Sequence, residues 1–364
     1  MTSVIALSHL YLYRRLVVQP GRRGRARWAV TVGLAALALS MPLCLALGRA
    51  LAPSGRALFV VGFGWMGLGF LLSLSLATTD LLRLLLRAVE GPASEERRRF
   101  LGRVSAASAS LVAGGLGAWG VAEALSPVVR RVRVSLRRLS PSMSGTRIVQ
   151  LTDVHVGPLV QAGFVARVVA EANALAPDVV VITGDLVDGS VERLAAEVAP
   201  LAGLRARHGV YFVTGNHEAY SGVEAWVAHL RGLGIVVLRN ERVRIGGDDG
   251  FDLAGVDDFR SGTHDVARAL AGRDPAREVV LLAHQPKSVR DAARHGVGLQ
   301  LSGHTHGGQI FPWGLLVALD QPVVEGLAAF GETQVWVSRG TGTWGPPMRV
   351  GAPPEISEIT LVAG

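Results

Sequence analysis

The sequence has a single cysteine among 364 residues, Cys44, and it lies in an apolar run. A disulfide framework within the chain and a cluster of thiolate ligands are therefore excluded. Acidic residues are scarce in residues 1–145, which contain 19 Arg and Lys against 5 Asp and Glu, for a net charge of +14. Residues 146–364 contain 18 against 24, for a net charge of −6. Because the cations gather outside the second part, no nucleic-acid partner is expected for it.

Charge is absent from two long apolar runs, Trp28–Gly48 and Ala57–Thr79. A helix needs about 20 apolar residues to cross a bilayer, and soluble helices of this length usually carry a polar face. A third, weaker run lies at about 104–122. We therefore expect residues 1–130 to be a transmembrane region in the cell membrane, with multi-pass spans at about 28–48, 57–79 and 104–122. A basic linker is expected at 131–145.

Arginines around the predicted spans indicate an orientation. Segments 14–27 and 83–103 hold six Arg each, and the loop 49–56 holds two. Positively charged loops stay in the cytoplasm, so the third span would carry the following domain to the extracytoplasmic side. Five Arg between Arg130 and Arg138 oppose this orientation. The segment RRRFLGR at 97–103 fits the core of a twin-arginine signal; the alternative is an ordinary stop-transfer cluster.

From Thr146 onward, short apolar segments alternate with stretches of helical spacing such as Phe164–Ala176. This alternation is typical of an α/β domain. Five of the apolar segments are followed at once by Asp, Asn or His: TRIVQLTDVH, DVVVITGDLVD, GVYFVTGNHE, EVVLLAHQP and GLQLSGHTH. Sites in open α/β sheets lie beyond the carboxyl ends of the strands. One edge of a sheet should therefore receive Asp153, His155, Asp185, Asn216, His217, His284, His304 and His306.

Half of the ten histidines of the chain fall at these five segment ends. Any one of them alone would be read as a hydrogen-bonded surface histidine, but all five together indicate a shared site. Imidazole and carboxylate ligands suit Zn²⁺, Mn²⁺ or Fe²⁺. Two such cations about 3.5–4 Å apart form a clamp for in-line attack at phosphorus. The pattern therefore predicts a metal-dependent reaction of a phosphoester.

Five motifs carry a family resemblance, in this order: DVH at 153–155, GDLVD at 184–188, GNHE at 215–218, His284, and GHTH at 303–306. The set resembles the calcineurin-like metallophosphoesterases. The tail and the segment SGHTHGGQIFP are most similar to the membrane-anchored or exported bacterial branch of that family. The resemblance implies that residues 146–364 form a four-layer α/β/β/α sandwich around two mixed sheets.

The resemblance also implies two divalent metal ions, Mn, Zn or Fe, and a role for each motif residue. One ion would be held by Asp153, His155 and His306, the second by Asn216, His284 and His304, and Asp185 would bridge them. His217 would be the catalytic residue that binds phosphate or protonates the leaving oxygen. Purple acid phosphatases carry a metal-binding Tyr where this chain has Asp188, which argues against a purple ferric enzyme.

The leading interpretation is a membrane-anchored phosphoesterase that hydrolyses phosphomonoesters or phosphodiesters by attack of a metal-bridging hydroxide. Its substrate would be a phosphoester, and a lipid-linked or cell-envelope compound is among the candidates. One alternative is a lipid-linked pyrophosphatase of the UDP-2,3-diacylglucosamine hydrolase type, which requires a cytoplasmic active site. Another is a non-catalytic membrane sensor or anchor that keeps the fold. The complete ligand set argues against this last alternative.

Overall fold

The computed structural model describes residues 2–47, 55–87 and 94–364. Gly48, the end of the first predicted span, and most of the arginine-containing loop 49–56 lie outside the described residues. The described chain forms two compact units. One comprises the helices that precede residue 123 together with Gly345–Val350, and the other comprises Glu123–Trp344 with Gly351–Gly364.

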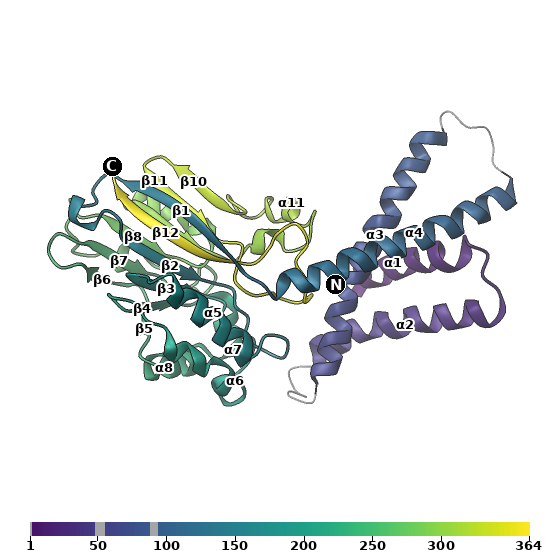
Figure 1. Ribbon diagram of the computed structural model, residues 1–364, viewed down its shortest axis with the longest axis horizontal. Coiled ribbons are helices and arrows are strands. Elements are labelled where there is room, and N and C mark those ends of the chain that lie inside the picture. The colour runs from purple at the N-terminus through teal and green to yellow at the C-terminus, as the bar shows by residue number, and fades with distance from the viewer. Residues whose placement is uncertain (1, 48–54, 88–93) are drawn as a thin grey trace. The chain divides into compact units, whose positions relative to one another are not determined.

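The first unit is helical. Its helices are α1 (Thr2–Tyr13), a π-helical turn (Arg14–Val18), α2 (Gly24–Leu47), α3 (Arg56–Arg87) and α4 (Glu95–Ala124) (Figure 1). Within the described residues, α2, α3 and α4 are long and apolar enough to cross a membrane. They contain the described parts of the three predicted spans, so these apolar helices lie where the sequence predicts them. By contrast, α1 has only 12 residues, fewer than a span needs.

Two glycines let the segment Gly345–Val350 pack closely on α3 and α4 within this unit. A Cβ atom added to Gly67 would lie 2.6 Å from Sδ of Met348, so no larger residue fits there without a shift. At Gly120 the backbone approaches close enough for its carbonyl to accept a hydrogen bond of 2.8 Å from the N–H of Arg349. These contacts tie the segment to the helices.

Two six-stranded sheets form the centre of the second unit. The first has the order β1-β12-β2-β3-β4-β5. Strand β12 pairs antiparallel with β2, and the other neighbours in this sheet are parallel. Its strands are β1 (Val128–Leu136), β2 (Arg147–Leu151), β3 (Val179–Thr183), β4 (Val210–Val213), β5 (Val236–Val237) and β12 (Glu355–Ala363).

The second sheet has the order β10-β11-β9-β8-β7-β6. Its three inner pairs are parallel, whereas the outer pairs β10–β11 and β6–β7 are antiparallel. Its strands are β6 (Glu241–Ile245), β7 (Phe251–Gly255), β8 (Val279–Leu282), β9 (Leu299–Ser302), β10 (Gly326–Phe330) and β11 (Thr333–Val337). Both sheets are therefore mixed, as the family resemblance implied.

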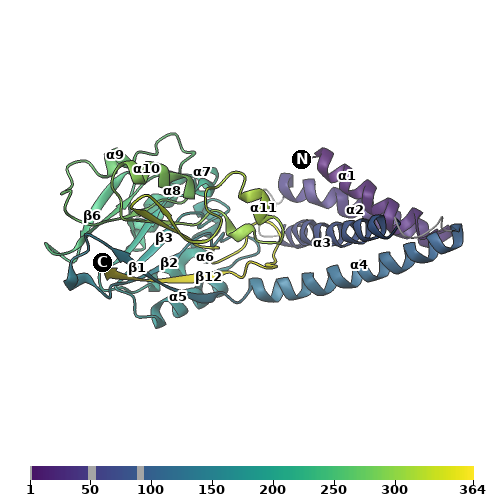
Figure 2. The same ribbon diagram turned by 90° about the horizontal axis from the view of Figure 1, so that it is seen from above.

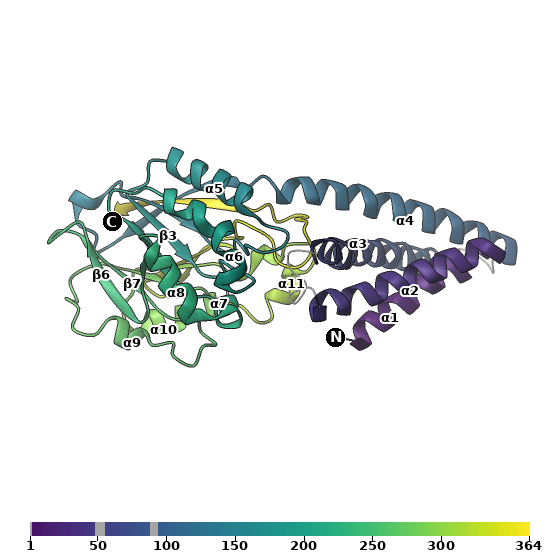
Figure 3. The same ribbon diagram turned by 90° about the horizontal axis from the view of Figure 1, so that it is seen from below.

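Three apolar clusters hold the layers together. Alternate residues of β3 point to opposite faces, so that Val180 packs with α5 (Ala162–Ala174), α6 (Val191–Val198) and α8 (Val223–Gly232). Val181 faces the second sheet and shares a cluster with Leu282. The other face of the second sheet packs on α9 (Val266–Ala269) and α10 (Val289–Arg294). Figures 2 and 3 show α9 and α10 on the side opposite α5. The predicted α/β/β/α sandwich is confirmed.

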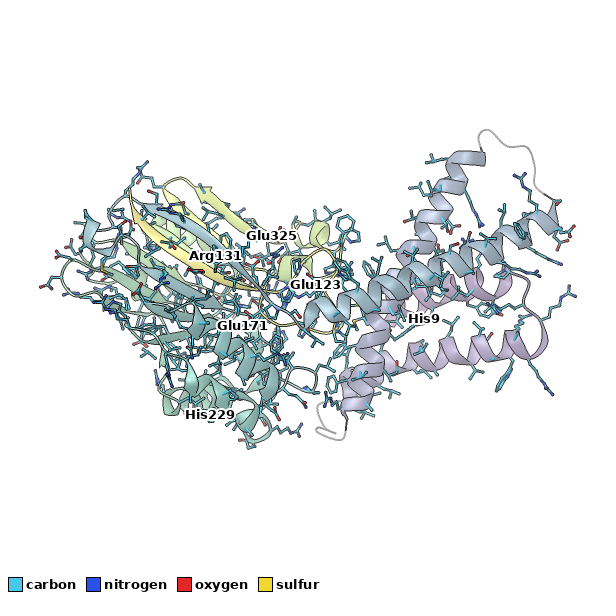
Figure 4. The ribbon with its side chains drawn as sticks, viewed as in Figure 1. His9, Glu123, Arg131, Glu171, His229 and Glu325 are labelled. Atoms are coloured by element: carbon cyan, nitrogen blue, oxygen red, sulfur yellow. The ribbon has the colours of Figure 1, made fainter. Side chains whose placement is uncertain are left out.

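The predicted linker at 131–145 is wrong, because most of its first half belongs to β1. This strand pairs with β12 along its whole length and buries Val134 and Leu136. Two of its arginines have partners in β12: Nη1 of Arg130 lies 3.4 Å from Glu355, and Nε of Arg131, labelled in Figure 4, lies 2.7 Å from Glu358. The run resembles a linker in sequence because its many arginines interrupt the alternation of apolar and polar residues that is typical of a half-buried strand.

This correction predicts the effect of substitutions in β1. Leu136→Ala should lower the free energy of unfolding by about 2–5 kcal/mol, since it leaves a cavity in the cluster between the sheets. Val128→Ala, on the half-exposed start of the same strand, should cost less than about 1 kcal/mol. Denaturant unfolding of the full chain in detergent measures both. Equal, negligible effects would show that residues 128–136 do not contribute to the folded sheet.

Candidate metal centre

The predicted site residues follow strands of both sheets. Strands β2, β3 and β4 of the first sheet precede Asp153, Asp185 and Asn216, whereas β8 and β9 of the second sheet precede His284 and His304. The expectation that one edge of a single sheet receives all of them is therefore wrong. The residues converge where the carboxyl ends of strands from two packed sheets meet. Periodicity cannot distinguish one sheet from two, because both give the same buried strand pattern.

The first group consists of Asp153, His155 and His306, whose ligand atoms all lie within 4.8 Å of one another. Nε2 of His306 lies 3.1 Å from Nε2 of His155 and 3.4 Å from Oδ1 of Asp153. The carboxylate of Asp153 is fully buried and accepts hydrogen bonds from the backbone N–H of His304 and from the hydroxyl of Thr152. It is thereby fixed in position before any ion binds.

The second group consists of Asp185, His284 and His304, again within 4.8 Å. Nε2 of His284 lies 3.1 Å from Oδ2 of Asp185 and 3.2 Å from Nδ1 of His304. Nδ1 of His284 donates to the carbonyl of Thr183, which leaves Nε2 directed at the group. Asp185 also lies 4.0 Å from Nε2 of His155, so this one carboxylate adjoins both groups.

Asn216, the remaining predicted ligand, begins helix α7 (Asn216–Ser221). Its Oδ1 atom is buried and has no hydrogen-bond partner among the described residues. An amide oxygen buried in this way costs free energy unless something satisfies it. The next residue, His217, donates its backbone N–H to Oδ1 of Asp185 at 2.8 Å. Asn216 is thus held beside the shared carboxylate with an oxygen that a cation would satisfy.

The glycines of the motifs make room for the carboxylates. A Cβ atom on Gly215 would lie 2.2 Å from Oδ1 of Asp185, and one on Gly303 would lie 2.1 Å from Oδ2 of Asp153. Any other residue would displace a carboxylate of the site. Backbone conformations with a positive φ angle, which are strained for residues other than glycine, also cluster here, as is common at functional sites. Five of the seven predicted ligands have a positive φ angle: Asp153, His155, Asp185, His304 and His306.

Asp188 connects two histidines of the centre. Its Oδ1 lies 2.5 Å from Nδ1 of His217 and 3.3 Å from Nδ1 of His155. Burial disfavours its charged form, but these histidines hold the pKa of Asp188 well below its usual range. Burial likewise opposes the charged form of His217, yet the hydrogen bond to Asp188 and the charge of Asp185 raise the pKa of His217 to about 9. Asp188 therefore orients both rings and keeps Nδ1 of each as a donor.

Glu218 is a buried residue of the site to which the sequence assigned no role. It is almost fully buried and accepts hydrogen bonds from the backbone N–H groups of Asp185, Leu186 and Gly215 at 2.6–3.0 Å. Burial and the nearby charge of Asp185 raise the pKa of Glu218 to about 7. The GNHE motif is visible in the sequence, but a carboxylate that binds backbone across two loops leaves no signal there.

The electrostatics and the donor set fit bound cations. Nδ1 of His155 and of His284 act as donors, so the Nε2 atoms of these two rings face carboxylate oxygens and further imidazoles. Burial and the charge of His284 lower the pKa of His304 to about 3, whereas the charge of Asp185, against the effect of burial, raises the pKa of His284. A cation bound at the second group would therefore displace a proton from His284. Neutral imidazoles and buried carboxylates are the form in which these side chains bind metals. Both groups can thus hold a divalent ion.

Four further polar or aromatic side chains lie at different places in this unit. The Trp344 and Tyr220 rings both contact His217 edge-on, with centroids 5.6 and 5.5 Å apart, and both are largely exposed. Arg260 is more than half exposed, and its Nη2 lies 3.8 Å from Asp320. Nε of Arg339 lies 2.7 Å from the buried Glu355. Of these, Trp344 and Tyr220 lie next to the predicted catalytic histidine.

Comparison with known proteins agrees with this geometry. Residues 146–308 match the family model of the calcineurin-like phosphoesterases. An uncharacterized metallophosphoesterase of Aquifex aeolicus is 35% identical over 258 residues, which cover 68% of this chain and 96% of that protein. A transmembrane protein with metallophosphoesterase domain from Bos taurus is 44% identical over 255 residues, covering 65% of this chain and 57% of that protein.

An uncharacterized metallophosphoesterase of Helicobacter pylori is 41% identical over 243 residues, covering 65% of this chain and 64% of that protein. The chain thus spans less than two thirds of the length of the Bos taurus and Helicobacter pylori relatives. The sandwich fold and the paired Asp/His groups define a metallophosphoesterase domain. The chain belongs to the calcineurin-like metallophosphoesterase family, and the predicted family is confirmed.

The shared position of Asp185 predicts the behaviour of the variant Asp185→Asn. The amide keeps the volume but loses the negative charge that adjoins both groups, so the purified full chain should lose most of its bound divalent metal at both positions. Elemental analysis after equilibration with Mn²⁺ measures this loss. The matched control is Asp249→Asn, whose carboxylate is on an exposed loop. Retention of two ions by Asp185→Asn would contradict the shared-ligand assignment.

Proposed function

We propose that this chain is a metal-dependent phosphoesterase that hydrolyses phosphomonoesters or phosphodiesters. The observation that carries the proposal is the convergence, from two sheets, of two Asp/His groups that adjoin one shared carboxylate. A scaffold or sensor gains nothing from burying carboxylates and opposing imidazoles so close together. Bound cations would offset much of the cost of such burial, which supports the catalytic alternative over a non-catalytic membrane anchor.

The proposed ligands follow the two groups. Asp153, His155 and His306 would hold one divalent ion, Asn216, His284 and His304 the other, and Asp185 would contact both. Mixed nitrogen and oxygen donors suit Mn²⁺, Zn²⁺ or Fe²⁺. Two such ions supply Lewis-acid activation of water and of the phosphate oxygens. The protein would contribute fixed positions, because further hydrogen bonds hold both carboxylates and the rings of His155 and His284.

His217 is the proposed general acid. Its Nε2 lies 3.9 Å from Oδ2 of the shared Asp185, so the ring faces the space between the groups. Its Nδ1 is engaged with Asp188, which leaves Nε2 as the atom that donates a proton to the leaving oxygen. Because Asn216 and His217 are adjacent in the chain, the metal role and the acid role fall on neighbouring residues of one motif.

A lipid-linked pyrophosphate remains the second candidate substrate. The observation that favours it is the pair of exposed aromatic rings, Trp344 and Tyr220, against His217. Exposed aromatic rings beside a reactive group are suited to an apolar part of a substrate. This alternative requires a cytoplasmic active site, so the side of the membrane discriminates between the two proposals.

We propose a multi-pass topology with the metallophosphoesterase domain on the extracytoplasmic side. Three apolar helices and the transmembrane relative support membrane association. The orientation is supported by the arginines of segments 14–27 and 83–103, which would remain in the cytoplasm. The twin-arginine-like segment begins within the first turns of α4. It is consistent with export of the sequence that follows this helix.

Substitution of His217 should separate catalysis from metal binding. His217→Ala should keep both ions yet lose roughly 10²–10⁴-fold in kcat on an alkyl phosphate, whose alkoxide leaving group needs a proton. A nitrophenyl phosphate, with a good leaving group, should be affected much less. Rates of the full chain in detergent with Mn²⁺, together with elemental analysis, measure both effects.

The matched control for this experiment is His208→Ala, because His208 precedes β4 and so lies at the end of that strand opposite His217. Its rates should equal those of the unaltered chain. Loss of metal from His217→Ala, or equal slowing of both substrates, would contradict the acid role. Failure of the metal-loaded, unaltered chain to hydrolyse any phosphoester would contradict the proposed function itself.

Reporter fusions test the orientation of the chain in the membrane. Alkaline phosphatase fused after Gly364 should be active in a bacterial host, since this reporter needs the disulfides that form outside the cytoplasm. The same reporter fused after Pro20, within the arginine-rich segment 14–27, should be inactive. An inactive fusion at Gly364, with normal amounts of protein, would place the domain in the cytoplasm and favour the lipid-linked pyrophosphatase.

A further inference from the structure

An uncharged segment follows the predicted metal ligand His306 in the second unit. Residues 310–319, IFPWGLLVAL, contain no charged side chain, and α11 (Gly314–Val317) lies within them. α11 lies at one end of the sheets in all three views. Large apolar side chains of this segment are exposed: Phe311 (66%), Trp313 (50%), Leu315 (68%), Leu316 (53%) and Leu319 (84%). Such a cluster on a protein surface marks an interaction site. We call residues 311–319 the apolar loop.

The backbone of the apolar loop is hydrogen-bonded within the loop itself. The N–H of Leu316 donates to the carbonyl of Trp313 at 2.9 Å, and that of Leu319 donates to the carbonyl of Leu316 at 3.1 Å. The N–H groups of Leu315 and Ala318 have partners in the loop as well. In hydrocarbon an unpaired backbone group costs several kilocalories per mole, so only a segment that pairs its own amides enters a bilayer readily. The loop meets this requirement.

The loop is also fixed to the rest of its unit. The backbones of Gly308 and Gly314 approach so closely that a Cβ on Gly308 would lie 2.3 Å from N of Gly314. The side-chain amide of Gln309 donates to the carbonyl of Trp344 at 2.9 Å and accepts from its N–H at 3.1 Å. The exposed side chains therefore project from a fixed base, and their exposure is a property of the folded domain.

The short connection between the apolar helix α4 and this unit indicates that a lipid bilayer covers the apolar loop. Helix α4 is long and apolar enough to cross a membrane and ends at Ala124, and β1 begins at Val128. This connection reaches roughly 14 Å at most, so the domain stays beside any bilayer that α4 crosses. Lys287 and Arg260 flank Asp320 at the end of the loop, which leaves one positive charge in excess. Aromatic and leucine side chains with nearby cations are typical of segments that enter a lipid interface.

We propose that the apolar loop inserts into the interface of a lipid bilayer and gives the domain a second membrane contact besides its helices. The side chains of Phe311, Leu315, Leu316 and Leu319 enter the boundary between headgroups and acyl chains. Lys287 and Arg260 meet lipid phosphates. Because the loop follows His306 in the chain, the contact holds this side of the proposed metal centre at the membrane surface.

The test uses the full chain in phosphatidylcholine–phosphatidylglycerol vesicles. In a Cys44→Ala background, Leu315→Cys and Leu319→Cys are each labelled with an environment-sensitive nitrobenzoxadiazole fluorophore. Val236→Cys, at an exposed (42%) apolar position on the edge strand β5, is the control. Lipids carrying a doxyl quencher in the upper acyl chain should remove most of the emission at the two loop positions and little at Val236.

The emission of the loop labels should also shift to shorter wavelength in vesicles relative to the Val236 label. Thermal unfolding of each labelled variant must match that of the unlabelled chain, which shows that the fold is kept. Loop labels that are quenched no more than the Val236 label would overturn the proposal. A shift to shorter wavelength without doxyl quenching would also overturn it, since the cover would then be a second copy or another protein.

Discussion

The domain depends on keeping two ionisable carboxylates, those of Asp153 and Asp185, buried at the meeting point of two sheets. Removing a carboxylate from water costs several kcal/mol unless hydrogen bonds and opposite charges offset the cost. The compensating groups come from elsewhere in the chain: the backbone N–H of His304, after a strand of the second sheet, binds Asp153, and His284 contacts Asp185. The site therefore requires both sheets in register, and the apolar cluster between them maintains that register.

A second set of groups fixes the loops that carry these residues. Glu218 binds backbone N–H groups on both sides of Asp185 and at Gly215, so that the GDLVD and GNHE segments are held together by one side chain. Asp188 likewise holds the rings of His155 and His217 together, because it accepts a hydrogen bond from Nδ1 of each. The left-handed backbone at the ligands is strained, and these hydrogen bonds supply free energy that holds it. The geometry is thus set by the protein before any ion arrives.

Much of this structure can be predicted from the sequence because it is local. The buried strands β2, β3, β4, β8 and β9 are adjacent in the chain to the polar residues that follow them. The apolar helices are recognised by the length and composition of their runs. Non-local features could not be predicted. Strand β1 resembles a linker in sequence because the partners of Arg130 and Arg131, Glu355 and Glu358, belong to β12, more than 200 residues away in the chain. The division of the ligands between two sheets, and the role of Glu218, likewise depend on contacts that no periodicity records.

The position of β12 between β1 and β2 has a consequence for biosynthesis. During translation the strand that follows α4 is made early, but its neighbour in the sheet, β12, is the last strand of the chain to be made. Until then β1 has no partner among the described strands and β2 lacks one of its two. Pairing between segments so distant in the chain is slow, and an unpaired edge invites wrong association. The gap between β1 and β2 therefore stays open until β12 has been made, and the risk of wrong association is greatest during that interval.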